Sequence, residues 1–309
     1  MSPRKLLITG VNGFIGRNVA LAAIRRGDSV YGTDLHSPEH VAIPGIADYQ
    51  PLTLPSPLFA EYIGRIKPDT LIHCSGRASV PLSIHDPETD FLMSVNVTFR
   101  LLEQMRLECP NTLFVFLSSA AVYGNPQFMP VNEALEVSPI SPYGFHKYMA
   151  EQACLEYAKV FGLRTTAGRI FSAYGPGLHR QVVWDIFRKT IHDPIVNLQG
   201  TGEETRDFLH VKDVAAALLL IADRAPGRGE VYNIASGQET SIAHLAQMII
   251  EVLHRNVQVC FDGHNPPGMP LKWQADISRL RSLGFEPRID IRTGLEGYAQ
   301  WITAEISPE

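Results

Sequence analysis

The stretch KLLITGVNGFIGRNVALAAIRRG, residues 5–27, decides the fold class of this 309-residue chain. It opens with a short β-rich run that ends at Gly10, and it closes with apolar residues at helical spacing. Between the two lies GVNGFIG, a GxxGxxG motif made by Gly10, Gly13 and Gly16. A strand, a glycine turn and a helix in this order bring backbone N–H groups up to a pyrophosphate, where any Cβ would obstruct. We therefore predict a dinucleotide-binding site at this turn.

An acidic residue ends the next β-rich run, DSVYGTD, and strengthens this prediction. Asp34 lies at about the distance from the glycines that such sites require. Its carboxylate would accept hydrogen bonds from the adenosine ribose hydroxyls and repel a 2′-phosphate, and no arginine follows it closely. The sequence therefore favours NAD over NADP. The alternative, three glycines at ordinary turns, fits this strand–turn–helix context poorly.

Further β-rich runs alternate with helical segments through the first half of the chain. After residues 5–10 and 28–34, the predicted strands cover residues 47–54, 69–76, 111–119 and 163–171, although Pro51 weakens the first of these four. The longest predicted helices cover residues 86–108 and 142–161. This alternation predicts an α/β fold, a Rossmann-type doubly wound parallel sheet with helices on both faces.

The pattern becomes less regular after about residue 170. Proline and glycine concentrate in AYGPGL, RAPGRG and NPPGMP, and helical periodicity returns only in IRTGLEGYAQWI near the end. We predict an NAD-binding domain over residues 1–170 and a smaller mixed domain over 171–309 that binds the substrate. The chain is expected to return to the first domain around residues 205–228.

Composition and charge exclude several classes of function. The chain is 45% hydrophobic and 19% charged, with a net charge of −5 and no basic stripe, so nucleic acid is a poor partner. No apolar run approaches the roughly 20 residues that cross a membrane. The four cysteines are scattered and the eleven histidines show no metal-ligand spacing, so we expect free thiols, no metal site and a cytoplasmic location.

A tyrosine and a lysine four residues apart are candidates for proton transfer. In SPYGFHK, residues 141–147, Tyr143 and Lys147 would share one helix face. A free tyrosine has a pKa of about 10, so a phenolate near neutral pH costs on the order of 4 kcal/mol. A neighbouring ammonium offsets part of that cost, and the phenolate could then act as a general base toward a hydroxyl. The alternative is a core tyrosine beside a solvated lysine.

Two serines close the strand predicted over residues 111–119. Ser118 and Ser119 would lie at the carboxyl edge of the sheet, where doubly wound folds place their ligands. A serine hydroxyl there can bridge a substrate oxygen and a tyrosine. The alternative reading is a helix cap or a turn.

Together these features make the chain resemble the extended short-chain dehydrogenase/reductases, in the group of NAD-dependent nucleotide-sugar epimerases and dehydratases. The resemblance covers nearly the whole length and is specific for the family, though much less so for the substrate. The motifs that carry it are GVNGFIG (10–16), LIHCSGRASVPLSIHDP (71–87), SVNVT (94–98), SSAAVYG (118–124), SPYGFHK (141–147), AYGPG (173–177), TRDFLHVKDVA (205–215), YNIASG (232–237) and ADIS (275–278).

The resemblance implies a role for each matching residue. The implied cofactor contacts are Gly10, Gly13, Phe14, Ile15, Gly16, Asp34 and Lys147. The implied catalytic residues are Ser119, Tyr143 and Lys147. The implied substrate contacts are Ser118, Asn96, Ser172, Arg206 and Lys272. Arg206 would clamp the diphosphate of a sugar nucleotide, a task suited to a bidentate guanidinium.

The chain departs from the family pattern at several positions. Dehydratases carry Asp-Glu after the catalytic hydroxyl, whereas this chain has Ala120-Ala121, and a methyl group cannot transfer protons. SSAAVYG is instead similar to the 4-epimerases, such as UDP-glucose 4-epimerase. Ser172 stands where the family often has asparagine. The usual arginine before ADIS is missing, with Lys272 as the nearest cation.

Three functions remain open from the sequence. The leading one is an NAD-dependent nucleotide-sugar 4-epimerase acting through a transient 4-keto sugar. The second is an NAD(P)H-dependent reductase of a 4-keto-6-deoxy nucleotide sugar. The segment around residues 268–270 resembles the corresponding segment of such reductases. The third is a catalytically inactive binding protein, which the intact tyrosine, lysine and serine disfavour. The family also implies a homodimer through the helices around 90–108 and 143–161.

Overall fold

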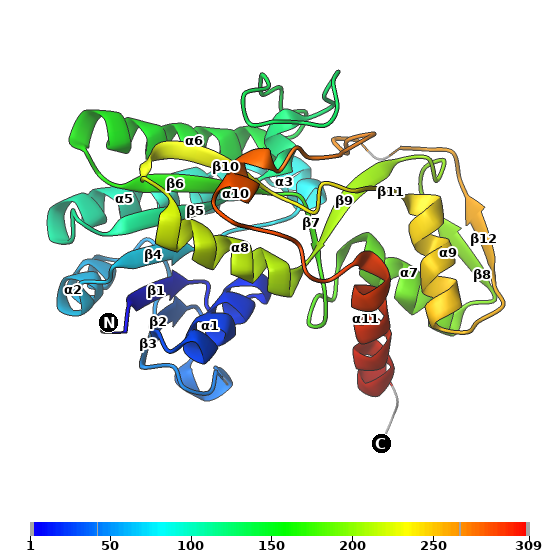
Figure 1. The fold of residues 1–309 in the computed structure, drawn as a ribbon, viewed down its shortest axis with the longest axis horizontal. Helices are drawn as coiled ribbons and strands as arrows, with labels where there is room; N and C mark the ends of the chain where they lie inside the picture. The colour runs from blue at the N-terminus through cyan, green and yellow to red at the C-terminus, as the bar shows by residue number, and fades with distance from the viewer. Residues whose placement is uncertain (1–2, 42, 266, 307–309) are drawn as a thin grey trace.

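A computed structural model describes residues 3–41, 43–265 and 267–306, and it has two parts (Figure 1). The larger part is built on a seven-stranded sheet in which every pairing is parallel, in the order β10-β6-β5-β4-β1-β2-β3. The strand order reverses between β1 and β4, the point where doubly wound sheets bind ligands. The strands are β1 (Lys5–Thr9), β2 (Ser29–Asp34), β3 (Asp48–Pro51), β4 (Thr70–His73), β5 (Leu113–Ser119), β6 (Thr165–Ile170) and β10 (Arg228–Ile234).

Apolar side chains on the central strands point alternately to the two faces of the sheet, which explains why both faces are covered. On β1, Leu6 and Ile8 enter one hydrophobic cluster while Leu7 enters another. On β5, Val115 joins the first cluster and Phe114 joins the second. Because successive side chains of a strand point to opposite faces, a continuous apolar run needs a helical layer on each side.

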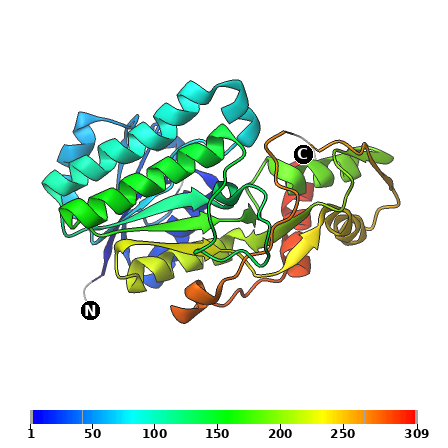
Figure 2. The same cartoon turned by 90° about the horizontal axis from the view of Figure 1, so that it is seen from above.

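The two helical layers lie on opposite faces of this sheet (Figure 2). Helices α1 (Phe14–Arg26) and α8 (Val211–Arg224) cover the face of the first cluster. Helices α2 (Pro57–Ile66), α5 (Val97–Glu108) and α6 (Pro142–Phe161) cover the other. The predicted α/β doubly wound fold is therefore confirmed.

The smaller part has its own hydrophobic core and two short sheets. Strands β7 (Ser172–Tyr174), β9 (Thr205–His210) and β11 (Glu239–Ser241) form one, and β8 (Ile195–Leu198) and β12 (Gln258–Phe261) form the other. Its main helices are α7 (Gln181–His192), α9 (Ile242–Val252) and α11 (Ile291–Ile306). The boundary predicted at residue 170 stays a prediction; α8 and β10, which come later in the chain, pack on the large sheet.

Short helical segments lie near the carboxyl edge of the sheet and in the connections. They are η1 (Pro38–His40), α3 (Val80–His85), α4 (Pro87–Phe91), η2 (Leu92–Asn96), η3 (Ala120–Tyr123) and α10 (Ser278–Ser282). The helix predicted over 86–108 is thus interrupted, because η2 is a π-helical turn between α4 and α5. Pro51 ends β3, an edge strand, where its missing N–H costs no ladder hydrogen bond. Within the described residues, no helix is both long and apolar enough to span a bilayer.

Candidate active site

The glycine loop forms the first wall of the site and joins β1 to α1. Gly10 has φ +66°, and a Cβ on it would lie 2.7 Å from Ser75 N, so the turn requires glycine. A Cβ on Gly16 would overlap the Gly10 carbonyl oxygen, which lets α1 pack closely against the strand. A Cβ on Gly13 would contact only that same oxygen, at 3.2 Å. The loop surface at Gly13 is therefore open to a ligand. Phe14 and Ile15 follow as the first residues of α1.

Asp34 ends β2 and is tied directly to the glycine loop. Its Oδ2 accepts a hydrogen bond from Asn12 N at 2.9 Å, and its Oδ1 accepts one from Leu35 N at 2.7 Å. The side chain is 12% exposed. The carboxylate is thus fixed beside the turn that approaches a pyrophosphate, an arrangement that fits the ribose of a dinucleotide.

Ser119, Tyr143 and Lys147 come together at the carboxyl edge of β5. Ser119 lies near enough to Tyr143 to lower the pKa of the phenol, against the effect of burial. Lys147 Nζ donates to the Leu117 carbonyl oxygen at 2.9 Å and lies 5.8 Å from the centre of the Tyr143 ring. Tyr143 is only 9% exposed and Lys147 only 6%. The structure therefore brings the three predicted catalytic residues together, with Tyr143 and Lys147 buried and Ser119 half-buried.

The start of α6 is fixed from several sides, which positions Tyr143. Ser141 caps the helix by accepting a hydrogen bond from Gly144 N at 3.2 Å. A Cβ on Gly144 would lie 2.5 Å from the Ala121 carbonyl oxygen, so glycine allows the helix to approach η3. Ser83 Oγ, on α3, accepts a hydrogen bond from Tyr143 N at 3.1 Å.

Burial and neighbouring charges shift the proton affinities of the pair. Burial raises the pKa of Tyr143, and the nearby Ser119 opposes that rise; the charge of Asp90 raises the pKa and that of Arg180 lowers it. Burial lowers the pKa of Lys147 to about 8, and the charge of Asp90 is the largest effect opposing it. An ammonium and a phenol this close, both removed from water, are equipped to exchange a proton with a bound hydroxyl.

The two serines at the end of β5 have different surroundings. Ser119 Oγ accepts a hydrogen bond from Ala121 N at 3.2 Å, as the cap of η3. Ser118 is 3% exposed and its Oγ has no partner among the described residues. The cap reading of Ser119 is therefore confirmed, and its contact with a substrate oxygen stays a prediction.

The predicted substrate residues are spread over both parts, because Asn96 and Ser118 lie in the large part and Ser172, Arg206 and Lys272 in the smaller part. Arg206 on β9 donates to the Thr205 carbonyl oxygen at 2.7 Å and lies 5.6 Å from the Trp273 ring, and burial lowers its pKa to about 10. Ser172 lies on β7, which pairs with β9. Lys272 is exposed, and Asn96 ends the π-helical turn η2.

One buried pair near this site was not predicted from the sequence. Asp90 on α4 is fully buried, and its Oδ2 lies 2.7 Å from Nδ1 of His146 on α6. No motif marked Asp90, whereas His146 could have been found by its position one turn after Tyr143.

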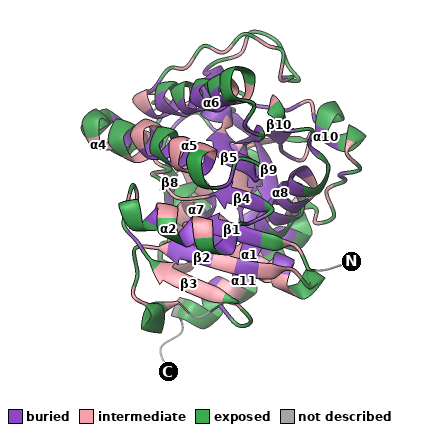
Figure 3. Ribbon diagram, turned by 90° about the vertical axis from the view of Figure 1, so that its left-hand side faces the viewer, coloured by how far each residue is buried: buried purple, intermediate pink, exposed green. Residues whose placement is uncertain are grey.

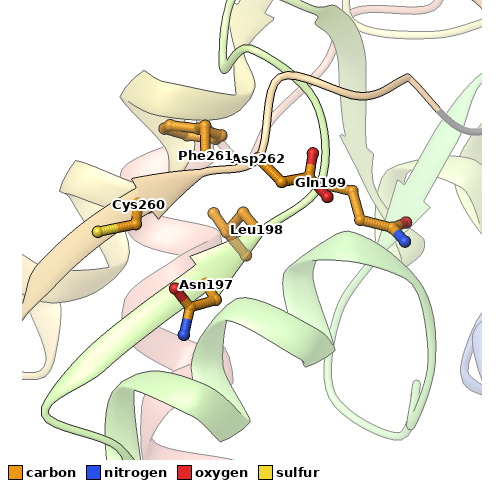
Figure 4. A pocket seen from close by; sticks show the side chains of 6 residues that line it. All are labelled: Asn197, Leu198, Gln199, Cys260, Phe261 and Asp262. Atoms are coloured by element: carbon orange, nitrogen blue, oxygen red, sulfur yellow. The ribbon is translucent and has the colours of Figure 1, made fainter.

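A cavity of about 290 Å³ lies away from these residues, between the ends of β8 and β12 (Figure 4). Its lining residues are Asn197, Leu198, Gln199, Cys260, Phe261 and Asp262. None of them belongs to the predicted site. All four cysteines are free; Cys109 and Cys154 are buried, and Cys74 and Cys260 are partly exposed.

Comparison with known proteins identifies the family. The sequence model described as "NAD dependent epimerase/dehydratase family" matches residues 6–235. The chain belongs to this family. It is therefore an NAD-dependent enzyme, and the binding of NAD by the glycine loop and Asp34 stays a prediction.

Members of the epimerase/dehydratase family with different activities match the chain about equally well. A UDP-glucose 4-epimerase of Mycolicibacterium smegmatis is 28% identical, over 94% of this chain and 96% of that protein. A GDP-6-deoxy-D-mannose reductase of Pseudomonas aeruginosa is also 28% identical, over 94% and 95%. The solved structure of MoeE5 in complex with UDP-glucose and NAD has a TM-score of 0.89 and 28% identity, over 98% of this chain and all of that one.

Proposed function

We propose that the chain is a nucleotide-sugar 4-epimerase. The observation that supports this most is that buried Tyr143 and Lys147 lie next to half-buried Ser119, beside Ala120 and Ala121. The cluster offers one base and no second acid or base in the position where dehydratases carry them. A site with that content can oxidise and reduce a carbinol carbon but lacks the groups to eliminate water.

In this proposal Tyr143 is the general base. It takes the proton from the sugar 4-hydroxyl, and Ser119 holds the reacting oxygen by hydrogen bonding. Lys147 stabilises the phenolate by its charge and holds the nicotinamide ribose. The glycine loop, Asp34 and Lys147 would hold NAD, which would supply a hydride acceptor for C4 and the return of that hydride to the opposite face of the sugar. Tyr143 then gives its proton back to the oxygen, so no net proton or electron is consumed.

The remaining predicted residues would hold the substrate and the rest of the cofactor. Gly13 and the N-terminus of α1 would face the pyrophosphate of NAD, and Asp34 its adenosine ribose. Arg206 would clamp the diphosphate of the sugar nucleotide, because its guanidinium is already partly withdrawn from water. Ser118, Asn96, Ser172 and Lys272 complete the proposed set of substrate contacts.

A reductase of a 4-keto-6-deoxy nucleotide sugar is the second candidate. It would use the same tyrosine, lysine and serine, but with an exchangeable reduced cofactor. The support is the relative named GDP-6-deoxy-D-mannose reductase, which matches over nearly the full length. Asp34 opposes a 2′-phosphate and therefore favours NADH over NADPH in either case.

We also propose a cytoplasmic homodimer that pairs α5 and α6 of one protomer with those of its partner. Figure 3 shows exposed residues along the outer sides of these two helices. Large apolar side chains among them are Phe99, Leu107, Phe145, Met149, Val160 and Phe161. Several large exposed apolar side chains on two helices that pack together support an interface there. Phe99→Glu is expected to give a monomer by analytical ultracentrifugation, whereas Ile195→Glu, an exposed apolar position on β8, is not.

The cofactor decides between the two enzymatic candidates. The protein is purified with no nucleotide added, denatured, and the released nucleotide is identified and counted. An epimerase is expected to release NAD close to one equivalent and to interconvert C4 epimers, with UDP-glucose and UDP-N-acetylglucosamine as the first substrates. Absence of retained nucleotide, together with NAD(P)H oxidation by a 4-keto sugar nucleotide, would instead establish the reductase.

A further inference from the structure

Arg206 on β9 is a half-buried cation that makes no ion pair with any described residue. Its hydrogen bonds go to two backbone carbonyl oxygens, that of Thr205 at 2.7 Å and that of Leu271 at 3.4 Å, and both come from Nη1. The carboxylate of Glu204, two residues earlier, instead accepts a hydrogen bond from Gly202 N at 2.9 Å. Within the described residues, Nε and Nη2 of Arg206 therefore keep their hydrogens free for an anionic ligand.

The indole of Trp273 lies where a carboxylate partner of Arg206 could otherwise stand. The guanidinium carbon is 5.6 Å from the centre of the Trp273 ring, within the range of a cation–π contact. Such a contact stabilises the cation through the ring quadrupole and leaves its charge intact. An aspartate or glutamate in this place would compete with a diphosphate for the guanidinium, whereas an indole does not.

Trp273 is itself fixed by both parts of the molecule. The residue is 8% exposed, and its Nε1 donates to the Gly124 carbonyl oxygen at 3.2 Å. Its ring packs edge-on against Phe171 at 5.7 Å between ring centres. Its backbone N donates to the Thr205 carbonyl oxygen at 3.2 Å, which ties the residue to β9. The indole can therefore hold the neighbouring guanidinium in one place.

The contact between Trp273 and Gly124 also links Arg206 to the reacting groups. Gly124 directly follows η3, the turn that Ser119 caps. Trp273 and Tyr143 belong to the same hydrophobic cluster. A diphosphate bound by Arg206 would thus be held at a defined distance from the catalytic residues. Such precision matters, because a misplacement of about 1 Å can cost about 10²-fold in rate.

We propose that Trp273 is a positioning residue for Arg206, whose guanidinium it holds with Nε and Nη2 free at the place where the diphosphate of a nucleotide sugar binds. This inference rests on the proposed role of Arg206 as the diphosphate clamp. Without the indole, Arg206 would keep its charge but occupy more rotamers. Ordering the side chain would then oppose binding of the ligand.

A double-mutant cycle with Trp273→Leu and Arg206→Gln tests the proposal. The probes are UDP and GDP, whose binding is measured by calorimetry, and the cycle uses the one that binds more tightly. Trp273→Leu is expected to raise Kd by about three- to thirtyfold, the range of a partly desolvated cation–π contact. In the Arg206→Gln background, the same substitution should change Kd by less than about twofold. No effect of Trp273→Leu, or an equal effect in both backgrounds, would overturn the proposal.

Two further variants separate positioning from a purely structural role. Trp273→Phe keeps an aromatic face, so its Kd should stay within about threefold of native. Trp301→Leu is the matched control, because it removes an indole of the smaller part that packs against Trp184 at 6.2 Å between ring centres. Its Kd should equal that of the native protein. In turnover, Trp273→Leu should raise KM more than it lowers kcat, and a loss of kcat with a native KM would contradict the proposed role.

Fluorinated tryptophan at position 273 replaces Trp273→Leu if that variant does not fold. Ring fluorination keeps the shape and weakens the quadrupole, so Kd should rise with the number of fluorine atoms. A Kd independent of fluorination would overturn the proposal.

The NMR resonance of the Arg206 Nε–H group gives a readout that needs no ligand. It is assigned by its loss in Arg206→Gln, and it should lie upfield because the indole face shields it. We expect it to move downfield in Trp273→Leu and to stay in Trp301→Leu; a resonance that does not move in Trp273→Leu would overturn the inference. If neither UDP nor GDP binds the native protein, the proposed substrate class fails, while the resonance still decides the role of Trp273.

Discussion

The cofactor side and the substrate side of the site are built in different ways. On the large sheet, the carboxylate of Asp34 and the Lys147 ammonium each have a hydrogen-bond partner in the protein, and both side chains, like Tyr143, are largely buried. On the substrate side, the side chains of Ser172 and Lys272 make no hydrogen bond with any described residue. The reacting groups are thus fixed before any ligand arrives, whereas several substrate contacts are left to the ligand itself.

This difference explains why relatives with different substrates match the chain about equally well. A rigid, buried catalytic cluster can serve any sugar whose C4 is brought to it. Specificity then depends on the less constrained side, where single residues change without disturbing the fold. The following predictions test this contrast, from the largest expected effect to the smallest.

Replacing Tyr143 by phenylalanine removes one oxygen atom from the cofactor side of the site. We expect kcat to fall by about 10²–10⁴-fold, because general-base catalysis is lost. NAD retention and the thermal unfolding midpoint should stay close to native, since the ring still fills the same space. Turnover at the native rate would refute every catalytic role assigned here.

Gly16→Ala tests whether the glycine loop is fixed by packing. The new methyl group overlaps the Gly10 carbonyl oxygen, so we expect a loss of about 1–3 kcal/mol in the free energy of unfolding, measured by urea denaturation. Gly13→Ala is the matched control. Its Cβ meets little within the loop, so it should weaken NAD binding more than it lowers stability. Equal losses of stability in both variants would contradict the assignment of Gly16 to packing and of Gly13 to NAD binding.

Arg206→Gln tests the substrate side. We expect KM for the nucleotide sugar to rise by about tenfold or more with kcat nearly unchanged, because a charge-assisted contact made equally in the ground and transition states is lost. Lys272→Gln should raise KM by no more than about threefold, because an exposed ammonium gains little from pairing in water. A large effect of Lys272 with none of Arg206 would reverse the two assignments.

The pH dependence of activity should be set by the cofactor side of the site alone. The pKa of Lys147 is lowered to about 8, so its ammonium is present below that pH and is lost above it. Activity should therefore decline on the alkaline side, to about half where the ammonium is half-deprotonated. Because unfolded lysine keeps its proton to higher pH, this group contributes a stability that rises between about pH 8 and 10.4. If Arg206→Gln shifts the alkaline limb of the pH–activity profile, the titrating group lies on the substrate side instead.

Much of the large part could be predicted because its signals are local. The glycine loop, the apolar strand runs and the capped start of α6 each lie within a few consecutive residues. The π-helical turn over Leu92–Asn96 could not be predicted, since nothing in LMSVN distinguishes it from ordinary helix. The Asp90–His146 contact was also missed, because the two residues are far apart in the chain. In the sequence, each resembles an ordinary solvent-exposed polar residue.

The smaller part was predicted only in outline for the same physical reason. Its strands are three to six residues long, and its proline- and glycine-rich connections carry little periodicity. The position of Arg206 against Trp273 depends on a contact between separate segments, which no local pattern encodes. Roles carried over by resemblance fill that gap only as proposals.

The late position of β10 in the chain has a consequence for biosynthesis. Strand β6 is fully buried, yet its outer neighbour is β10, which the ribosome delivers only after the strands β7, β8 and β9 of the smaller part. Until residue 234 has emerged, the nascent chain presents β6 as a strand edge without its outer partner, and unpaired edges recruit other unfinished chains. A polypeptide released before that point contains the glycine loop and the tyrosine–lysine pair, but its sheet lacks the edge strand β10.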